Sequence, residues 1–151
     1  MQVMMRDARY TGLANQYPGD DMQLADKVAI ITGAARGLGR AYCEAMAREG
    51  ASIVAADIMS CDDTVASVTA AGGSAIAVHL DVADAQSCEA MAIQTIEAYG
   101  CIDVLINNAG SLIGRRTLLE ADDRFWSDVI SLNVGSVRRV TRAAAPHLIA
   151  A

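Results

Sequence analysis

A glycine-spaced turn between an apolar strand and a helical segment is the part of this sequence best suited to chemistry. Apolar residues run into Thr32-Gly33-Ala34-Ala35-Arg36-Gly37-Leu38-Gly39, and an alanine-rich segment follows. A helix that begins here would direct free N–H groups and the positive end of its dipole at a phosphate. Glycines permit the tight bend and let a pyrophosphate approach the backbone with no Cβ in the way. The spacing Gly-x-x-x-Gly-x-Gly differs from the commoner Gly-x-Gly-x-x-Gly, so a purely structural turn is the alternative interpretation.

A carboxylate at the end of the next apolar run is the second candidate for ligand recognition. Asp57 can accept hydrogen bonds there from the ribose hydroxyls of an adenosine. It would repel a 2′-phosphate and so favours NAD over NADP, whereas Arg36 beside the turn could hold that phosphate. Asp57 carries more weight, because burying like charges together costs more than a mobile surface arginine returns. The alternative is that Asp57 caps a helix or a loop.

Alternating strands and helices must position these residues. The expected strands cover residues 28–32, 52–57, 75–80 and 104–107. The expected helices cover residues 37–49, 62–71 and 84–99, and a last one that begins near Asp122 or Asp123. Several of these helices end at glycine, which is a common stop signal. The alternation predicts an α/β fold, a Rossmann-like doubly wound parallel sheet with right-handed crossovers.

Composition fits one soluble domain and argues against several classes of function. The chain has 151 residues and a hydrophobic content of 53% with few aromatics, which suits a sheet covered by helices. A net charge of −6 argues against a nucleic-acid partner, and no apolar run is long enough to cross a membrane. Four separated cysteines without a Cys-x-x-Cys pair indicate free thiols, no metal site and a cytoplasmic location.

Residues 1–23 differ from the rest of the chain and are expected to form a flexible N-terminal extension. They show no convincing periodicity and lack the apolar region of a signal peptide. Met22 is an alternative start to Met1, because the organised part begins shortly after it. Residues 24–151 are then expected to form a partial NAD(P)-binding Rossmann domain.

The glycine turn and four further motifs together resemble the short-chain dehydrogenase/reductase family, from about residue 24 to residue 151. The further motifs are Asp57, Asp81-Val82, Asn107-Asn108-Ala109-Gly110 and Asn133. The resemblance implies a dinucleotide cofactor, with Asp81-Val82 against the adenine and Asn108-Ala109-Gly110 near the nicotinamide-side ribose. Amides and small residues just past a strand end offer hydrogen bonds and room for a ligand. Alternatively, the asparagine amides tie that strand to neighbouring backbone.

The catalytic residues that the resemblance implies are present only in part. Asn133 matches an asparagine that helps to hold a water of the proton relay, so it is the one predicted catalytic residue. A tolerated polar residue on a half-buried helix is the alternative. The family also uses a serine and a general acid/base tyrosine followed four residues later by lysine. Lys27 is the only lysine here, and no tyrosine has a lysine four positions on.

The chain is therefore expected to be a truncated form, shortened by a premature stop or a frameshift. It resembles the cofactor-binding part of an NAD(P)-dependent oxidoreductase that acts on a small-molecule alcohol or ketone. Alone, it is expected to bind a dinucleotide, NAD more readily than NADP, without turnover. A non-catalytic nucleotide-binding module and a subunit completed by a partner chain are the alternatives. The substrate cannot be read, because residues 111–119 are the only candidates to line that side.

Truncation also affects the expected surface of the domain. The sheet would have the strand order 3-2-1-4 and leave the edge of strand 104–107 unpaired, which is an aggregation liability. The last helix carries an apolar stripe that is predicted to be core, formed by Trp126, Val129, Ile130, Val134 and Val137. Family members are usually homo-oligomers. Arg138, next to Arg139, stands where similar proteins commonly carry an aromatic, so the usual subunit packing of this helix is not carried over.

Overall fold

Residues 2–5 and 22–150 are described by the structure, a computed structural model of the chain. The flexible extension predicted over residues 1–23 therefore lies largely outside the described residues. The strands are β1 (Gln2–Met5), β2 (Val28–Thr32), β3 (Ser52–Asp57), β4 (Ser74–His79) and β5 (Val104–Asn107). The helices are α1 (Gly37–Arg48), α2 (Asp62–Ala70), α3 (Ala85–Tyr99), α4 (Asp123–Ile130) and α5 (Ser136–Ala150). A π-helical turn, η1 (Ser131–Gly135), joins α4 to α5.

The sheet has the order β1-β5-β2-β3-β4, and its four strands from β5 to β4 are parallel. This confirms the predicted order 3-2-1-4. β2 lies at the centre, where Ala29 is opposite both Ile53 of β3 and Val104 of β5. Because parallel strands run the same way, their carboxyl ends meet at one edge of the sheet, and that edge is where ligands bind in open α/β folds.

β1 covers the outer edge of β5. It runs antiparallel to β5, with Gln2 opposite Asn107 and Met5 opposite Val104. The prediction that this edge is unpaired is therefore wrong, because a segment from the start of the chain supplies the backbone partners that an edge strand lacks. The periodicity of so short a segment cannot reveal a pairing with residues so distant in the sequence.

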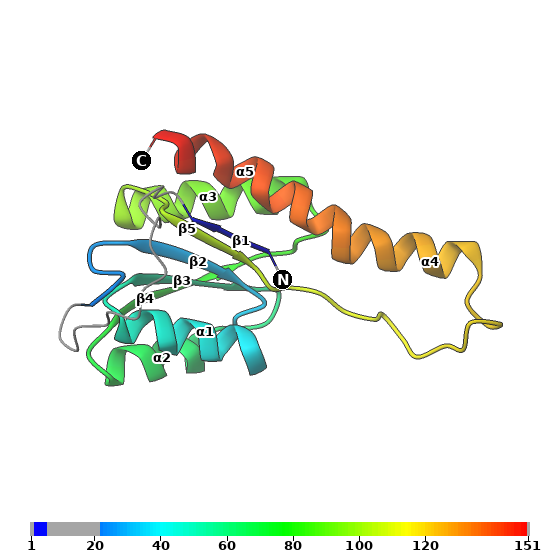
Figure 1. Ribbon diagram of the computed structural model, residues 1–151, viewed down its shortest axis with the longest axis horizontal. Helices are drawn as coiled ribbons and strands as arrows, with labels where there is room; N and C mark the ends of the chain where they lie inside the picture. Colours follow the sequence, from blue (N-terminus) through cyan, green and yellow to red (C-terminus); the bar gives the residue numbers. More distant parts are fainter. Residues whose placement is uncertain (1, 6–21, 151) are drawn as a thin grey trace, which may run out of the picture.

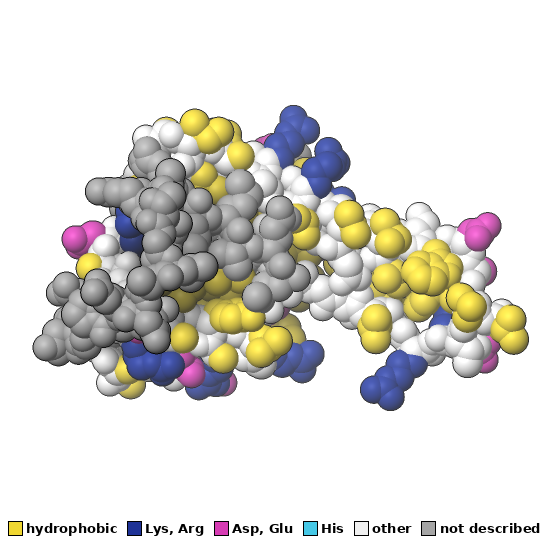
Figure 2. Space-filling model, in the orientation of Figure 1, with side chains coloured by type: hydrophobic (Ala, Val, Ile, Leu, Met, Phe, Trp, Pro, Cys, Tyr) yellow, Lys and Arg dark blue, Asp and Glu magenta, His cyan; other side chains and the backbone are white. Residues whose placement is uncertain are grey.

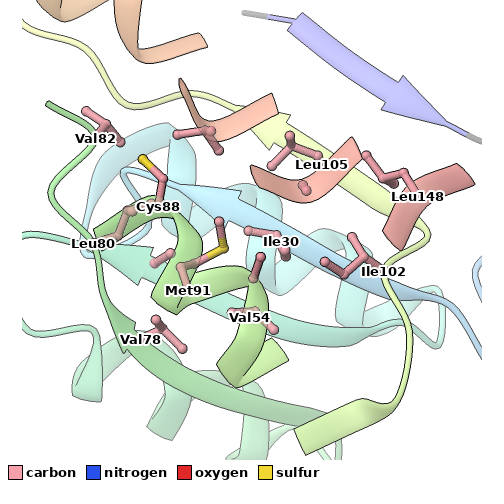
Figure 3. Close-up of a cluster of buried hydrophobic side chains, with 14 of the residues drawn as sticks. Ile30, Val54, Val78, Leu80, Val82, Cys88, Met91, Ile102, Leu105 and Leu148 are labelled. Carbon is pink, nitrogen blue, oxygen red and sulfur yellow. The ribbon is translucent and has the colours of Figure 1, made fainter. Parts of the chain in front are cut away.

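Helices cover both faces of the sheet (Figure 1). α1 and α2 lie on one face, and α3 and α5 lie on the other. Alternate residues of β2 divide between the two cores. Ala29 and Ile31 pack in the cluster that includes Cys43 of α1, whereas Ile30 packs in the cluster that includes Met91 of α3 (Figure 3). Every residue of β2 is buried, which explains its continuous apolar run.

α4 and the loop before it project from the body of the molecule (Figure 1). Trp126 is 49% exposed, Ile130 51% and Val134 59%, and α4 has no buried residue. The prediction that this apolar stripe is core is therefore wrong in this chain. Hydrophobic side chains instead gather on the surface of the projecting part (Figure 2). Helical spacing shows which residues share a face, but not whether another element covers that face.

Candidate functional site

The turn between β2 and α1 depends on two glycines whose side-chain positions are filled by backbone or by a neighbouring amide. Gly33 has a φ of +68°, and a Cβ there would come within 2.9 Å of the Asn108 amide nitrogen and 3.0 Å of the Ala109 Cα. A Cβ on Gly39 would overlap the carbonyl oxygen of Gly33. The helix can therefore begin this close to the strand only because neither residue carries a side chain.

Gly37, in contrast, faces open space at the start of α1. Among the described residues, a Cβ there would meet no atom within 4 Å. The N-cap residue Arg36 makes no side-chain cap, and the first turn of α1 contains no acidic residue. The N-termini of α3 and α4 are instead capped by Asp84 and Asp122. An uncapped helix N-terminus beside an open glycine suits an anionic group.

Asp57, at the carboxyl end of β3, holds the turn from the side. Its Oδ2 accepts a hydrogen bond from the N–H of Ala35, and its Oδ1 accepts one from the N–H of Met59, both at 3.0 Å. The buried hydroxyl of Thr64 in α2 donates to the carbonyl of Ala34 at 2.8 Å. Asp57 thus caps a loop, as the alternative interpretation predicted. Each carboxylate oxygen still has a lone pair for a further donor.

Thr32 joins the turn to the end of β5. Its buried hydroxyl donates to the carbonyl of Ile106 at 3.2 Å and accepts from the N–H groups of Asn108 at 2.9 Å and Ala109 at 3.0 Å. The side-chain amide of Asn108 donates to the carbonyls of Thr32 at 2.9 Å and Gly33 at 3.2 Å. Asn108 therefore ties two strand ends together, as the alternative interpretation for this amide predicted.

Asn133 lies in η1, and both polar atoms of its side-chain amide bind the backbone of Ser111. Its Oδ1 accepts from the N–H of Ser111 at 3.1 Å. Its Nδ2 donates to the carbonyl of Ser111 at 2.7 Å and to that of Val129 at 2.8 Å. A Cβ on Gly110 would lie 2.6 Å from this Oδ1, so a side chain at Gly110 would displace the contact. π-Helical turns are frequent at functional sites, and this one holds the loop that follows β5.

Asp81 and Val82, which follow β4, form the opposite wall. The Asp81 Oδ1 accepts from the N–H of Ala83 at 2.8 Å, and the carbonyl of Val82 accepts from the Nε of Arg139 at 2.9 Å. Val82 and Leu80 belong to the buried cluster that α3 and α5 cover (Figure 3). This wall is therefore supported by the core behind it.

These segments surround one cleft at the carboxyl ends of the parallel strands, with a volume of about 540 Å³. The predicted cofactor-binding residues that line it are Gly33, Arg36, Gly37, Asp57, Asp81, Val82, Asn108, Ala109 and Gly110. The other lining residues are Ile58, Met59, Leu80, Ser111 and Leu132. The sequence places Ser111 on the substrate side. The remaining four are apolar residues, whose types give no sign of a ligand.

The other predicted residues lie outside the lining. Ala35 and Gly39 shape the turn, Asn133 holds the loop after β5, and Leu38 is 68% exposed. Asn107 is buried at the end of β5 and donates to the hydroxyl of Thr141 in α5 at 3.2 Å. Asn107 therefore fixes the helix that covers β5.

In the part of the chain that the structure describes, no group of His, Cys, Asp or Glu could hold a metal ion. The four cysteines are free. Burial raises the pKa of Cys43 to about 12 and that of Cys61 to about 11, so both thiols stay protonated near neutral pH. Over the same described residues, every helix is too short or too polar to cross a membrane.

Comparisons with known proteins agree with this geometry. The sequence profile described as short chain dehydrogenase matches residues 27–151. The chain is 37% identical over 127 residues to a 2-dehydro-3-deoxy-D-gluconate 5-dehydrogenase of Escherichia coli, a match that covers 84% of this chain and 50% of that enzyme.

Two solved structures show the same fold. A dehydrogenase/reductase from Sinorhizobium meliloti 1021 superimposes with a TM-score of 0.80 at 31% identity, over 85% of this chain and 52% of that one. The carveol dehydrogenase from Mycobacterium avium in complex with NAD gives a TM-score of 0.78 at 30% identity, over 84% and 51%. The chain thus spans about half the length of each of these three relatives.

Proposed function

This chain belongs to the short-chain dehydrogenase family, and we propose that its cleft binds a nicotinamide dinucleotide, with NAD preferred over NADP. The start of α1 carries this proposal, because a helix N-terminus without a side-chain cap opens on the cleft at Gly37. Such a terminus binds anions through its free N–H groups and its dipole. The volume of about 540 Å³ lies within the roughly 300–1,000 Å³ of ordinary ligand sites.

Each part of the dinucleotide has a wall of suitable chemistry. The pyrophosphate would lie at Gly37, where no side chain blocks its approach to the backbone. Asp57 would accept hydrogen bonds from the adenosine ribose, and buried Val82 would contact the adenine. The small residues Ala109 and Gly110 would border the nicotinamide-side ribose. Support for this assignment comes from the family and from the position of all these residues around one cleft.

Two charged residues of the lining act in opposite directions on the choice between NAD and NADP. Arg36 is exposed and could approach a 2′-phosphate. Asp57 is half-buried and held by two backbone N–H groups, so its carboxylate cannot move away from a phosphate. Repulsion of a 2′-phosphate by the fixed Asp57 carboxylate should cost more free energy than attraction to the mobile, exposed Arg36 returns. This difference favours NAD.

We expect the protein to bind NAD at least about 10-fold more tightly than NADP, and Asp57→Asn to reduce that ratio to about threefold or less. The substitution removes the charge that would repel the 2′-phosphate. It also weakens the hydrogen bonds to Ala35 and Met59, but a loosened turn would lower the affinity for both cofactors equally. Calorimetric titration of both proteins with both nucleotides measures the ratio. An unchanged ratio in Asp57→Asn, or wild-type preference for NADP, would contradict the assignment.

The proposed reaction of the whole enzyme is hydride transfer between an alcohol or ketone and the nicotinamide ring, which supplies that chemistry when bound. The protein must then supply orientation and a proton. This sequence has one lysine, Lys27, and no Tyr-x-x-x-Lys pair, so we propose that the chain alone binds the cofactor without turnover. A relay role for Asn133, homo-oligomerisation and a cytoplasmic location stay predictions.

The second candidate is a subunit that a partner chain completes. The apolar surface of α4 and of the loop before it, which project from the body of the molecule, favours this candidate. Leu118 is 78% exposed and Leu119 99%, in the loop that precedes α4, and hydrophobic side chains gather on this projecting part (Figure 2). Contiguous exposed apolar surface marks a site of interaction more often than chance. Dehydrogenase turnover that appears only when a second polypeptide with a Tyr-x-x-x-Lys pair is added would favour this candidate over a non-catalytic module.

A further inference from the structure

Arg139 of α5 donates hydrogen bonds to two segments that border the cleft. Its Nε donates to the carbonyl of Val82 at 2.9 Å, and its Nη2 donates to the carbonyl of Ser131 at 2.9 Å. Val82 lies in the wall after β4, and Ser131 is the first residue of η1. A guanidinium group is planar and its donors have fixed directions, so the two carbonyls are held at a set separation.

The second of these segments is connected in turn to the loop after β5. Asn133 lies two residues after Ser131 and holds both the N–H and the carbonyl of Ser111. Leu132, between them, and Ser111 itself line the cleft. Hydrogen bonds of Arg139 and of Asn133, joined by the backbone of η1, therefore connect the wall at Val82 with the loop at Ser111.

The space for the guanidinium is provided by Gly135. A Cβ on Gly135 would lie 3.0 Å from the Nη1 of Arg139 and 3.3 Å from its Nη2. The π-helical turn interrupts the regular α-helical ladder, so a side chain can reach a carbonyl of the turn. Arg139 is half-buried, whereas its neighbour Arg138 is exposed, which offers a matched control one position away.

We infer that Arg139 is a positioning residue that holds the two walls of the cleft in register. It acts through Val82 on the side proposed for adenine, and through η1 and Asn133 on the side proposed for nicotinamide. The nature of the ligand rests on the proposed function, but the coupling between the walls does not.

Hydrogen exchange of the full chain without nucleotide tests the coupling. The amides to follow are those of Ala83, bonded to Asp81, and Ser111, bonded to Asn133. Arg139→Met keeps the apolar stem and is expected to speed exchange at both amides by about 10-fold. The control Arg138→Met should leave both rates unchanged. Faster exchange at only one amide, at neither, or equally in the control overturns the inference.

A conservative variant distinguishes loss of the two hydrogen bonds from general unfolding of the protein. Arg139→Lys retains the stem and the charge, but one ammonium nitrogen cannot replace two nitrogens aimed at separate carbonyls. Exchange at both amides is expected to lie between wild type and Arg139→Met. Wild-type rates in a folded Arg139→Lys protein would overturn the inference.

Titration with NAD and with AMP then separates this inference from the proposed function. Arg139→Met is expected to lower the affinity for NAD about 10-fold and that for AMP by less, because AMP reaches only the wall at Val82 that is proposed to contact adenine. An unchanged NAD affinity, or an equal loss for both ligands, overturns the positioning role. If wild type binds no NAD, the proposed function fails, while the exchange rates still decide the coupling.

Discussion

Thr32→Val is expected to lower the free energy of unfolding by about 2–4 kcal/mol, with a fall in Tm of roughly 5–15 °C. Valine has nearly the same shape, so the core stays filled and the loss comes from the hydroxyl. Without it, the N–H of Ala109 loses its acceptor. The N–H of Asn108 keeps only the carbonyl of Ile106, at 3.1 Å. The buried carbonyl of Ile106 also loses a donor, and a buried or half-buried polar group that loses its partner costs desolvation. Thermal and urea denaturation measure the loss.

Thr32→Ser is the matched control. Serine retains the hydroxyl and loses one methyl group, so the substitution should cost about 1 kcal/mol. NAD affinity should fall in Thr32→Val and change little in Thr32→Ser, since the hydroxyl fixes the backbone beside Ala109. Equal destabilisation by the two substitutions would show that Thr32 matters for packing and not for its hydrogen bonds.

Gly39→Ala is expected to cost about 3 kcal/mol or more and to remove measurable NAD binding. At an ordinary helix position this substitution would stabilise the protein by about 1 kcal/mol. Here the sign reverses, because the new Cβ would overlap the backbone carbonyl of Gly33, and no side chain can rotate to relieve the overlap. The turn or the helix must shift, and either movement displaces the N-terminus of α1 from the cleft.

Gly114→Ala provides the control for this second substitution. Gly114 is exposed, and a Cβ there would meet no atom of the described residues within 4 Å, so stability and NAD affinity should stay near wild-type values. Gly39→Ala protein as stable as Gly114→Ala, with unchanged NAD affinity, would contradict the proposed close packing of strand, turn and helix.

Much of the sheet could be predicted from local sequence. The bounds of β2, β3 and β5 match the predicted strands, because each contains a short apolar run with a polar residue on either side. The parallel order followed from the intervening helices. The strand β1 and the turn η1 were missed. Pairing of β1 depends on a distant partner, and η1 is continuous with helices on both sides, so neither leaves a local pattern.

The site was predictable where residue type carries the signal. The glycines, Asp57 and the asparagines can be predicted from their types and spacing, and the sheet brings them to one edge. Residues that contribute only their backbone or their apolar bulk, such as Met59 and Leu132, cannot be predicted in this way. Arg139 gave no signal either, because its partners are two carbonyls, one of them far away in the sequence. A hydrogen bond to backbone leaves no trace in the identity of the partner residue.

Chemical-shift mapping of isotope-labelled full chain during titration with NAD tests the dinucleotide site most directly. A dinucleotide in the cleft should shift the amides of Gly37, Met59, Val82 and Gly110, which line it. The amide of Ser52, at the opposite end of the parallel strands, should not move. Shifts confined to that opposite end, or no shifts at saturating NAD in a folded protein, would contradict a dinucleotide site in this cleft.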